Sequence, residues 1–129
     1  MKYRVLGRTN FKVSEIGMGT EHLLDKDEED VIQTIKAVVD GGVNYFDCHP
    51  GDDYDHNSHV YEGYKKLGKA ISFVNNRSEL RLTYLATASL PPSDARLKFE
   101  NFLRDMNTSY AKFCCINKNG MEHTIKNAR

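Results

Sequence analysis

The chain has 129 residues, 40% hydrophobic and 28% charged, which suits one domain over residues 1–129 with one hydrophobic core. Its 18 basic and 18 acidic residues cancel, and no basic stripe alternates with aromatics, so nothing predicts nucleic-acid binding. There is no apolar run of the roughly 20 residues that span a bilayer, no signal-peptide core after Met1, and no metal or disulfide spacing among the three cysteines, so we expect a cytoplasmic protein without a membrane partner.

The first twenty residues predict a β-hairpin followed by a strand. Residues 3–6 and 11–13 alternate apolar and polar side chains on either side of a Gly/Asn turn, which is typical of a hairpin. Residues 15–20 form the next predicted strand. Its glycines, Gly17 and Gly19, allow close approach of a ligand or of neighbouring backbone.

Residues 27–40 predict a helix. Asp27 is a suitable N-cap, three acidic residues follow it where the helix dipole favours anions, and apolar residues from Val31 to Val39 recur at helical spacing. Gly41 and Gly42 end the helix. The predicted strand 43–48 comes next and carries Asp47 at its end.

The rest of the chain continues the alternation of strands and helices. A polar loop at 49–57 leads into a predicted helix at 58–73. A strand at 80–87, a helix at 94–106 after Pro91 and Pro92, a strand at 110–116 and a short final helix at 120–128 complete the order. Such alternation predicts an α/β fold with parallel strands and right-handed crossovers.

Several blocks of the sequence together resemble one protein family. The densest is the opening stretch, Tyr-Arg-Val-Leu-Gly-Arg-Thr and then Lys-Val-Ser-Glu-Ile-Gly-Met-Gly-Thr. Further blocks are Gly-Gly-Val-Asn-Tyr-Phe-Asp and Leu-Gly-Lys-Ala-Ile, with looser matches over 84–87 and 99–110. These blocks cover roughly residues 1–117, and in this order they resemble the aldo-keto reductases.

The resemblance implies a particular version of the α/β fold. The family folds as a TIM-type (β/α)8 barrel closed at its base by an N-terminal hairpin, and a full barrel needs about 250 residues. This chain supplies the hairpin and about four β/α units. We therefore expect half a barrel, truncated relative to the family.

The resemblance also implies a catalytic set. The family reduces carbonyls with NADPH, using an Asp, a Tyr, a Lys and a His. Asp47 matches the Asp, and Tyr54 is the best match for the Tyr, with Tyr61 as the other candidate. At the positions of the Lys and the His stand Ala88 and Asn117. Loss of the Lys removes the partner of Asp47 and the cation that lowers the pKa of the Tyr.

By resemblance the cofactor is NADP(H), and Gly19, Thr20 and Asp47 match the positions that contact its nicotinamide end. The family holds the cofactor phosphates with loops from later strands that this chain lacks, and no Gly-x-Gly-x-x-Gly loop replaces them. We therefore expect an aldo-keto reductase-like oxidoreductase that is inactive as an isolated chain. The alternatives are a non-catalytic binding module and a truncated product of a longer iron–sulfur-type aldo-keto reductase.

Two further clusters have simpler interpretations. The loop holds ligand types that suit Zn or Mn, but we interpret it as a solvated loop without a metal; these residues are His49, Asp52, Asp53, Asp55, His56 and His59. The neighbouring Cys114 and Cys115 point to opposite faces of a strand, and we interpret them as inert thiols.

A half barrel leaves two sheet edges unpaired, at 15–20 and at 110–116. Exposed edges invite pairing with another chain, and most soluble oligomers are symmetric dimers. We therefore predict a homodimer through these edges. The alternative is that residues 118–129 of the same chain cover the open face.

Overall fold

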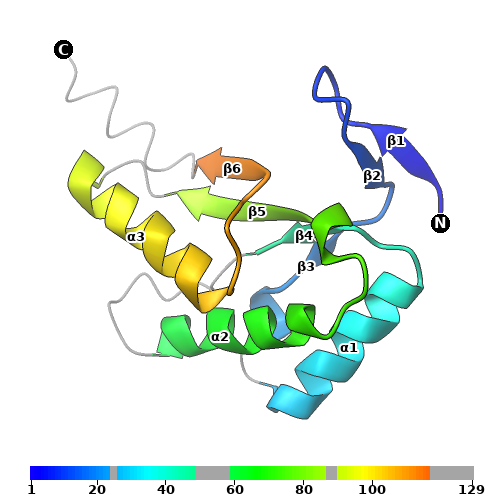
Figure 1. Cartoon of the computed structure of the whole chain (residues 1–129), viewed down its shortest axis with the longest axis horizontal. Helices are drawn as coiled ribbons and strands as arrows, with labels where there is room; N and C mark the ends of the chain where they lie inside the picture. The colour runs from blue at the N-terminus through cyan, green and yellow to red at the C-terminus, as the bar shows by residue number, and fades with distance from the viewer. Residues whose placement is uncertain (24–25, 49–58, 87–89, 117–129) are drawn as a thin grey trace.

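The computed structural model describes residues 1–23, 26–48, 59–86 and 90–116. Strands and helices alternate after an N-terminal hairpin (Figure 1). In chain order the elements are β1 (Tyr3–Val5), β2 (Lys12–Ser14), β3 (Met18–Gly19), the 3₁₀ turn η1 (Glu21–Leu23), α1 (Glu28–Asp40), β4 (Tyr45–Asp47), α2 (His59–Ser72), the 3₁₀ turn η2 (Arg77–Glu79), β5 (Arg81–Ala86), α3 (Pro92–Asp105) and β6 (Phe113–Ile116).

The strands form two sheets. β1 and β2 pair antiparallel as the hairpin, and β3, β4, β5 and β6 form a four-stranded parallel sheet in that spatial order. Strand order follows chain order, and a helix joins β3 to β4, β4 to β5 and β5 to β6. The predicted class, a hairpin followed by parallel β/α units of a TIM-type barrel, is confirmed.

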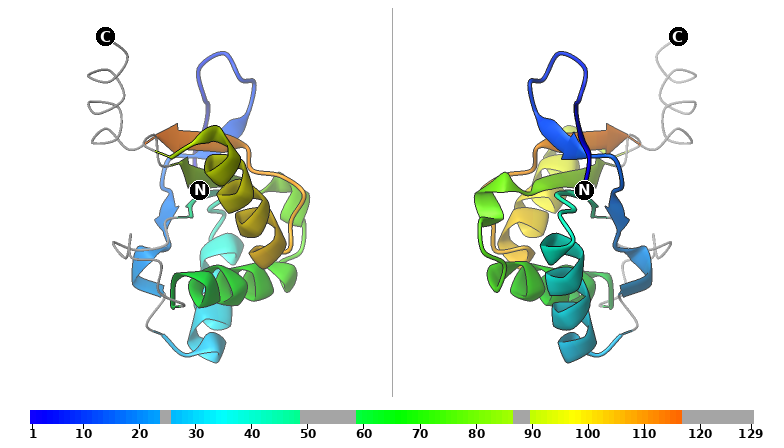
Figure 2. Two further views of the ribbon diagram at one scale, coloured as in Figure 1. Left: turned by 90° about the vertical axis from the view of Figure 1, so that its left-hand side faces the viewer. Right: turned by 90° about the vertical axis from the view of Figure 1, so that its right-hand side faces the viewer.

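The hydrophobic core lies between the parallel sheet and its helices. Phe46 and Leu82 are fully buried and Tyr84 nearly so, and all three belong to one apolar cluster with residues of α1, α2 and α3. Figures 1 and 2 show the helices gathered along the sheet, with α1 and α2 side by side. Side chains alternate along a strand, so the neighbours of these residues within β4 and β5 point to the opposite side of the sheet.

Helix α1 forms where the sequence predicts it. Asp27 precedes it in an extended conformation. Three acidic residues occupy its first turn, where the positive end of the helix dipole stabilises their negative charges. Val31 and Ile35 are its buried residues. The helix ends at Gly41, and Gly42 adopts φ +89°, which a residue with a side chain rarely does.

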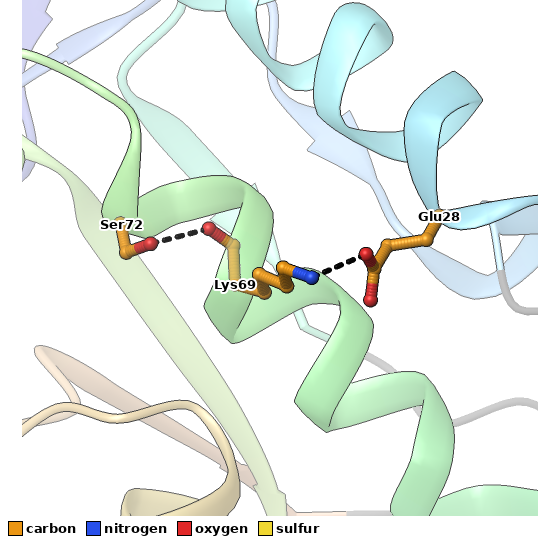
Figure 3. A network of polar contacts seen from close by, with 3 residues as sticks. All are labelled: Glu28, Lys69 and Ser72. Carbon is orange, nitrogen blue, oxygen red and sulfur yellow. Dashed lines mark hydrogen bonds and ion pairs between the residues drawn. The ribbon is translucent and has the colours of Figure 1, made fainter.

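A polar contact joins the surfaces of α1 and α2 (Figure 3). The ammonium group of Lys69 donates a hydrogen bond to the carboxylate of Glu28, and Ser72 Oγ donates to the carbonyl oxygen of Lys69. Both side chains of the ion pair are about half exposed, so its contribution to stability is small, roughly 0–1 kcal/mol. The apolar faces of the helices, rather than this pair, hold them together.

The hairpin lies at the N-terminal ends of the parallel strands. The amide group of Asn44, just before β4, accepts from the Ser14 N–H at 2.8 Å and donates to the Lys12 carbonyl at 3.0 Å. The ring of Phe11 meets the ring of Phe113 edge-on at 5.8 Å, and the guanidinium of Arg81 lies 5.1 Å from the Phe11 ring centre. The hairpin therefore covers the end of the sheet opposite to Asp47, the base in barrel terms.

None of the helices in the described ranges is both long and apolar enough to cross a membrane.

Candidate functional site

The candidate site is built on Asp47, the last residue of β4. The Asp47 carbonyl oxygen accepts two hydrogen bonds from Thr20, one from its N–H at 3.1 Å and one from its hydroxyl at 3.0 Å. The Asp47 carboxylate accepts a third, from the hydroxyl of Thr83 at 2.8 Å. Thr20 follows β3 and Thr83 lies on β5, so Asp47 links to both neighbouring strands. This network lies toward the C-terminal ends of parallel strands, where barrel enzymes place their chemistry.

The network is buried on one side and open on the other. Thr20 and Thr83 are 1% and 0% exposed, whereas Asp47 is an exposed residue. The Thr83 hydroxyl also accepts a hydrogen bond from the N–H of Cys48 at 3.1 Å. The buried Thr83 hydroxyl therefore orients a carboxylate that remains accessible to solvent, while Thr20 holds the Asp47 backbone.

Two acidic side chains behind Asp47 remain protonated at neutral pH. Burial raises the pKa of the Cys48 thiol to about 12, and the nearby charge of Asp47 adds to the effect. Burial also raises the pKa of Tyr64, whose hydroxyl donates to the Cys48 carbonyl oxygen at 3.3 Å. A fully buried thiol with a raised pKa is a poor nucleophile, so Cys48 serves packing rather than chemistry.

Tyr45 and Cys115 share the face of the sheet on which Asp47 lies. Burial raises the pKa of each, and the negative charge of Asp47 raises it further. Cys115 is on β6, two strands away from β4, and it is exposed. The Tyr45 ring lies 5.8 Å from the ring of Phe113. These contacts define a continuous face of the sheet opposite to the helices.

The structure brings together the three residues predicted at the nicotinamide end. Gly19 pairs with Asp47 in the β3–β4 register, and Thr20 bonds to Asp47 directly. Gly19 has open space where a side chain would stand, because no atom lies within 4 Å of the position of an added Cβ. The predicted grouping of Gly19, Thr20 and Asp47 thus has a structural basis, while its role in cofactor binding stays a prediction.

Other predicted residues lie outside what the structure describes. Tyr54, Ala88 and Asn117 fall outside the described ranges, as do the loop residues from His49 to His56. Tyr61 and His59 belong to α2, whose first four side chains are not described. Within the described ranges no three His, Cys, Asp or Glu side chains gather in a way that could hold a metal ion.

Sequence reasoning missed Thr83. It lies inside an apolar strand, and its partnership with Asp47 depends on the parallel register, in which Phe46 is opposite Leu82. The available signal was the alternation along β5, which puts Thr83 on the face of Arg81 and Leu85 rather than that of Leu82. Alternation alone does not show which residue on β4 lies beside Thr83, so it could not predict the contact with Asp47.

The side chains of this network fit only part of a dinucleotide. Thr20, Asp47 and Thr83 offer hydroxyl and carboxylate groups, which suit the carboxamide or ribose of a nicotinamide nucleotide. None of the three carries the positive charge, or forms the glycine-rich turn, that dinucleotide phosphates require. The network therefore does not fit the whole cofactor.

Comparison with known proteins identifies the fold. No protein-family model matches the sequence, and no curated protein matches it. Among solved structures, the thermostable aldo-keto reductase Tm1743, in complex with the inhibitor epalrestat, is similar over 99% of this chain at a TM-score of 0.71 and 21% identity.

Two aldo-keto reductases from Klebsiella pneumoniae, one in complex with NADPH and the other with NADP and acetate, are similar over 89% and 90% of the chain. Their TM-scores are 0.67 and 0.63, and each is 18% identical. The chain spans 51%, 41% and 43% of the lengths of these three relatives. It therefore has the fold of about half of an aldo-keto reductase.

Proposed function

We propose that this chain is an aldo-keto reductase-like half barrel that keeps the aspartate end of the active site but does not reduce carbonyls alone. The observation that carries the proposal is the position of Asp47. Its carboxylate lies at the C-terminal end of β4, held by Thr83 and adjacent to Gly19 and Thr20. That is the end of a barrel strand where catalytic groups are placed.

The expected lack of activity rests on the proton donor. A tyrosine with its ordinary pKa near 10 transfers a proton efficiently at neutral pH only when a cation lowers that value. By the family resemblance this cation is a lysine, and Ala88 stands at its position. In Tyr45 and Tyr64, which lie near Asp47, burial raises the pKa, so they are weaker acids than a free tyrosine.

The cofactor class is proposed by analogy with the similar structures, two of which hold NADPH or NADP. In this chain Gly19, Thr20 and Asp47 would contact only the nicotinamide end. A dinucleotide that the protein contacts only at its nicotinamide end, with no contacts to its phosphates, binds weakly. We therefore expect NADPH binding no tighter than about millimolar, roughly 4 kcal/mol of binding free energy.

Two measurements on the purified chain test the proposal. NADPH fluorescence titration should show no saturation at micromolar concentrations, and a panel of aldehydes and quinones should cause no protein-dependent loss of nicotinamide absorbance. Turnover that disappears in either Tyr54→Phe or Tyr61→Phe would overturn the proposal, because it would identify a working proton donor. Turnover insensitive to both would point to a contaminating reductase and leave the purified chain inactive, as proposed.

The second candidate function is a non-catalytic interaction module. The observation that favours it is the exposed side of the parallel sheet, where Asp47 and Cys115 are accessible. In this case the half barrel would serve to bind another polypeptide. Binding of a protein partner with no NADPH binding would distinguish this function from a reductase.

A further inference from the structure

The parallel sheet has an inner face with no helix against it in the described part of the chain. We define the inner face by the side chains that alternate with the buried Phe46, Leu82 and Tyr84. Its members are Tyr45, Asp47, Arg81, Thr83, Leu85, Phe113 and Cys115. The Tyr45 ring lies 5.8 Å from the Phe113 ring, so strands β4 and β6 contribute side chains to the same face.

Within the described residues, the hairpin covers the inner face at its base. Phe11 of the hairpin contacts Phe113 and Arg81 there. Toward the other end, Leu85 is half-buried, and Asp47 and Cys115 are exposed. In a complete barrel these positions fill the interior in layers, with four side chains in each layer contributed by alternate strands. Four strands supply half of each layer.

The sheet also ends in two strands that pair on one side only within the described residues. β6 pairs with β5 and β3 pairs with β4. β6 consists of Phe113, Cys114, Cys115 and Ile116, with neither a charge nor a proline to block the addition of another strand. The hydrogen-bonding groups along its free side are a template for a parallel strand.

We propose that the inner face binds a second copy of this chain, and that the two copies close an eight-stranded parallel barrel. A two-fold axis along the barrel axis brings β6 of one copy beside β3 of the other and keeps all strands parallel. The two-fold then repeats this junction at the second seam, so no edge remains. The chain covers 51% of the length of a similar aldo-keto reductase, and the resemblance implies an eight-stranded barrel for that family, so the four strands of each copy would span about half the circumference.

Two observations favour a second copy as the occupant. The formal net charge of zero means that two copies carry no overall repulsion. The hairpin, at the base of the sheet, also carries exposed apolar side chains: Val5 is 54% and Leu6 38% exposed. A two-fold along the barrel axis places both hairpins at the same end, where these side chains can cover one another.

The same symmetry has one unfavourable consequence, which gives the proposal a specific signature. Asp47 lies on the inner face near the open end, so its two copies face one barrel opening. Two carboxylates there repel each other, and replacing them with amides removes the repulsion. Asp47→Asn, which keeps an oxygen acceptor for the Thr83 hydroxyl, should therefore strengthen the dimer about two- to tenfold.

The experiment is sedimentation velocity and light scattering on the full 129-residue chain in reductant, across a micromolar concentration series. Cys115→Glu puts a charge on the inner face and should weaken the dimer at least about 100-fold, since an interface charge buried without a partner costs several kcal/mol. Cys114→Glu is the matched control. Cys114 is the preceding residue on β6 and is also exposed. It pairs with Tyr84 in the β5–β6 register and so points to the opposite side from Cys115, and this variant should remain dimeric.

Leu85→Glu supplies a second inner-face variant on β5, at the residue that pairs with Cys115 in the parallel register, and it leaves both cysteines unchanged. Circular dichroism should show native secondary structure in each variant. A monodisperse monomer at tens of micromolar would overturn the proposal. A dimer that is equally sensitive to Cys114→Glu and Cys115→Glu, or one that dissociates in reductant, would also overturn it. So would open-ended assemblies larger than a dimer whose size rises with protein concentration. None of these outcomes depends on whether the chain binds NADPH.

Discussion

Thr83 is the residue that connects the candidate site to the core. Its hydroxyl donates to the Asp47 carboxylate at 2.8 Å and accepts from the Cys48 N–H at 3.1 Å, and it is fully buried. One hydroxyl thus satisfies a buried backbone donor and orients an exposed carboxylate. A valine has the same shape but can do neither.

Thr83→Val should destabilise the chain by about 1–3 kcal/mol, because the buried Cys48 N–H would lose its acceptor. Urea unfolding followed by circular dichroism measures the change. Thr83→Ser keeps the hydroxyl and loses only a methyl group, so it should cost about 1 kcal/mol. A valine variant as stable as the parent chain, or a serine variant as unstable as the valine, would show that the hydroxyl is not what matters at this position.

Helix α2 approaches the end of α3 closely at Gly68. A Cβ added at Gly68 would lie 2.6 Å from the carbonyl oxygen of Asp105 and 2.7 Å from the Cα of Met106, at the end of α3. These are backbone atoms, which cannot move aside as a flexible side chain can. The helix pair therefore depends on the absence of a side chain at this position.

Gly68→Ala should lower stability by about 1–3 kcal/mol, the usual cost of overpacking, even though alanine favours helix formation in isolation by up to about 1 kcal/mol. Thermal and urea unfolding measure the loss. Gly19→Ala is the control, since no atom lies within 4 Å of the added Cβ and the change should be within about 0.5 kcal/mol. A stabilised Gly68→Ala would mean that helix propensity outweighs the contact.

Helices and the order of the elements could be predicted from the sequence, whereas strand ends and side-chain partners could not. The helix predicted at 27–40 is observed at Glu28–Asp40, because spacing and end signals are local. The strand predicted at 15–20 is observed only at Met18–Gly19. There the Ser14 hydroxyl bonds to the Ile16 carbonyl, and Gly17 lies against the Tyr45 ring.

The strand predicted from residue 110 begins only at Phe113. Before it, the Tyr110 hydroxyl donates a hydrogen bond to the carbonyl oxygen of Arg77. That contact joins residues 33 positions apart, so no local pattern contains it. At the candidate site the sequence likewise placed Asp47 at a strand end but could not show that Thr83 holds it. Local signals set the elements, and the contacts between them set the site.

The shared core predicts that the described elements unfold as one unit. Among the described elements, the apolar cluster draws on α1, α2 and α3 and on two parallel strands: Val31 and Ile35 come from α1, Phe46 from β4, Leu67 and Ile71 from α2, Leu82 from β5 and Phe102 from α3. Unfolding of any one of these helices would expose the apolar side chains of the other two to water. The domain prediction, one domain over residues 1–129, implies a single cooperative transition.

Phe102→Ala tests this cooperativity. Phe102 is 1% exposed, and its ring lies 5.0 Å from that of Tyr64 and 5.1 Å from that of Tyr84. Its removal from α3 should cost about 3–5 kcal/mol. Far-ultraviolet circular dichroism reports on the helices and near-ultraviolet circular dichroism on the tyrosine packing. Because α2, β5 and α3 meet at this residue, both urea midpoints should fall together, at one fixed protein concentration.

Leu97→Ala is the matched control within α3, since Leu97 is 57% exposed and its loss should change stability by no more than about 0.5 kcal/mol. Midpoints that separate in Phe102→Ala would contradict one cooperative unit, because they would show α3 detaching while the rest stays folded. If Leu97→Ala instead lowered stability as much as Phe102→Ala, the exposed side of α3 would have to be covered in solution. That result would place the dimer contact on the helices and count against closure through the inner face.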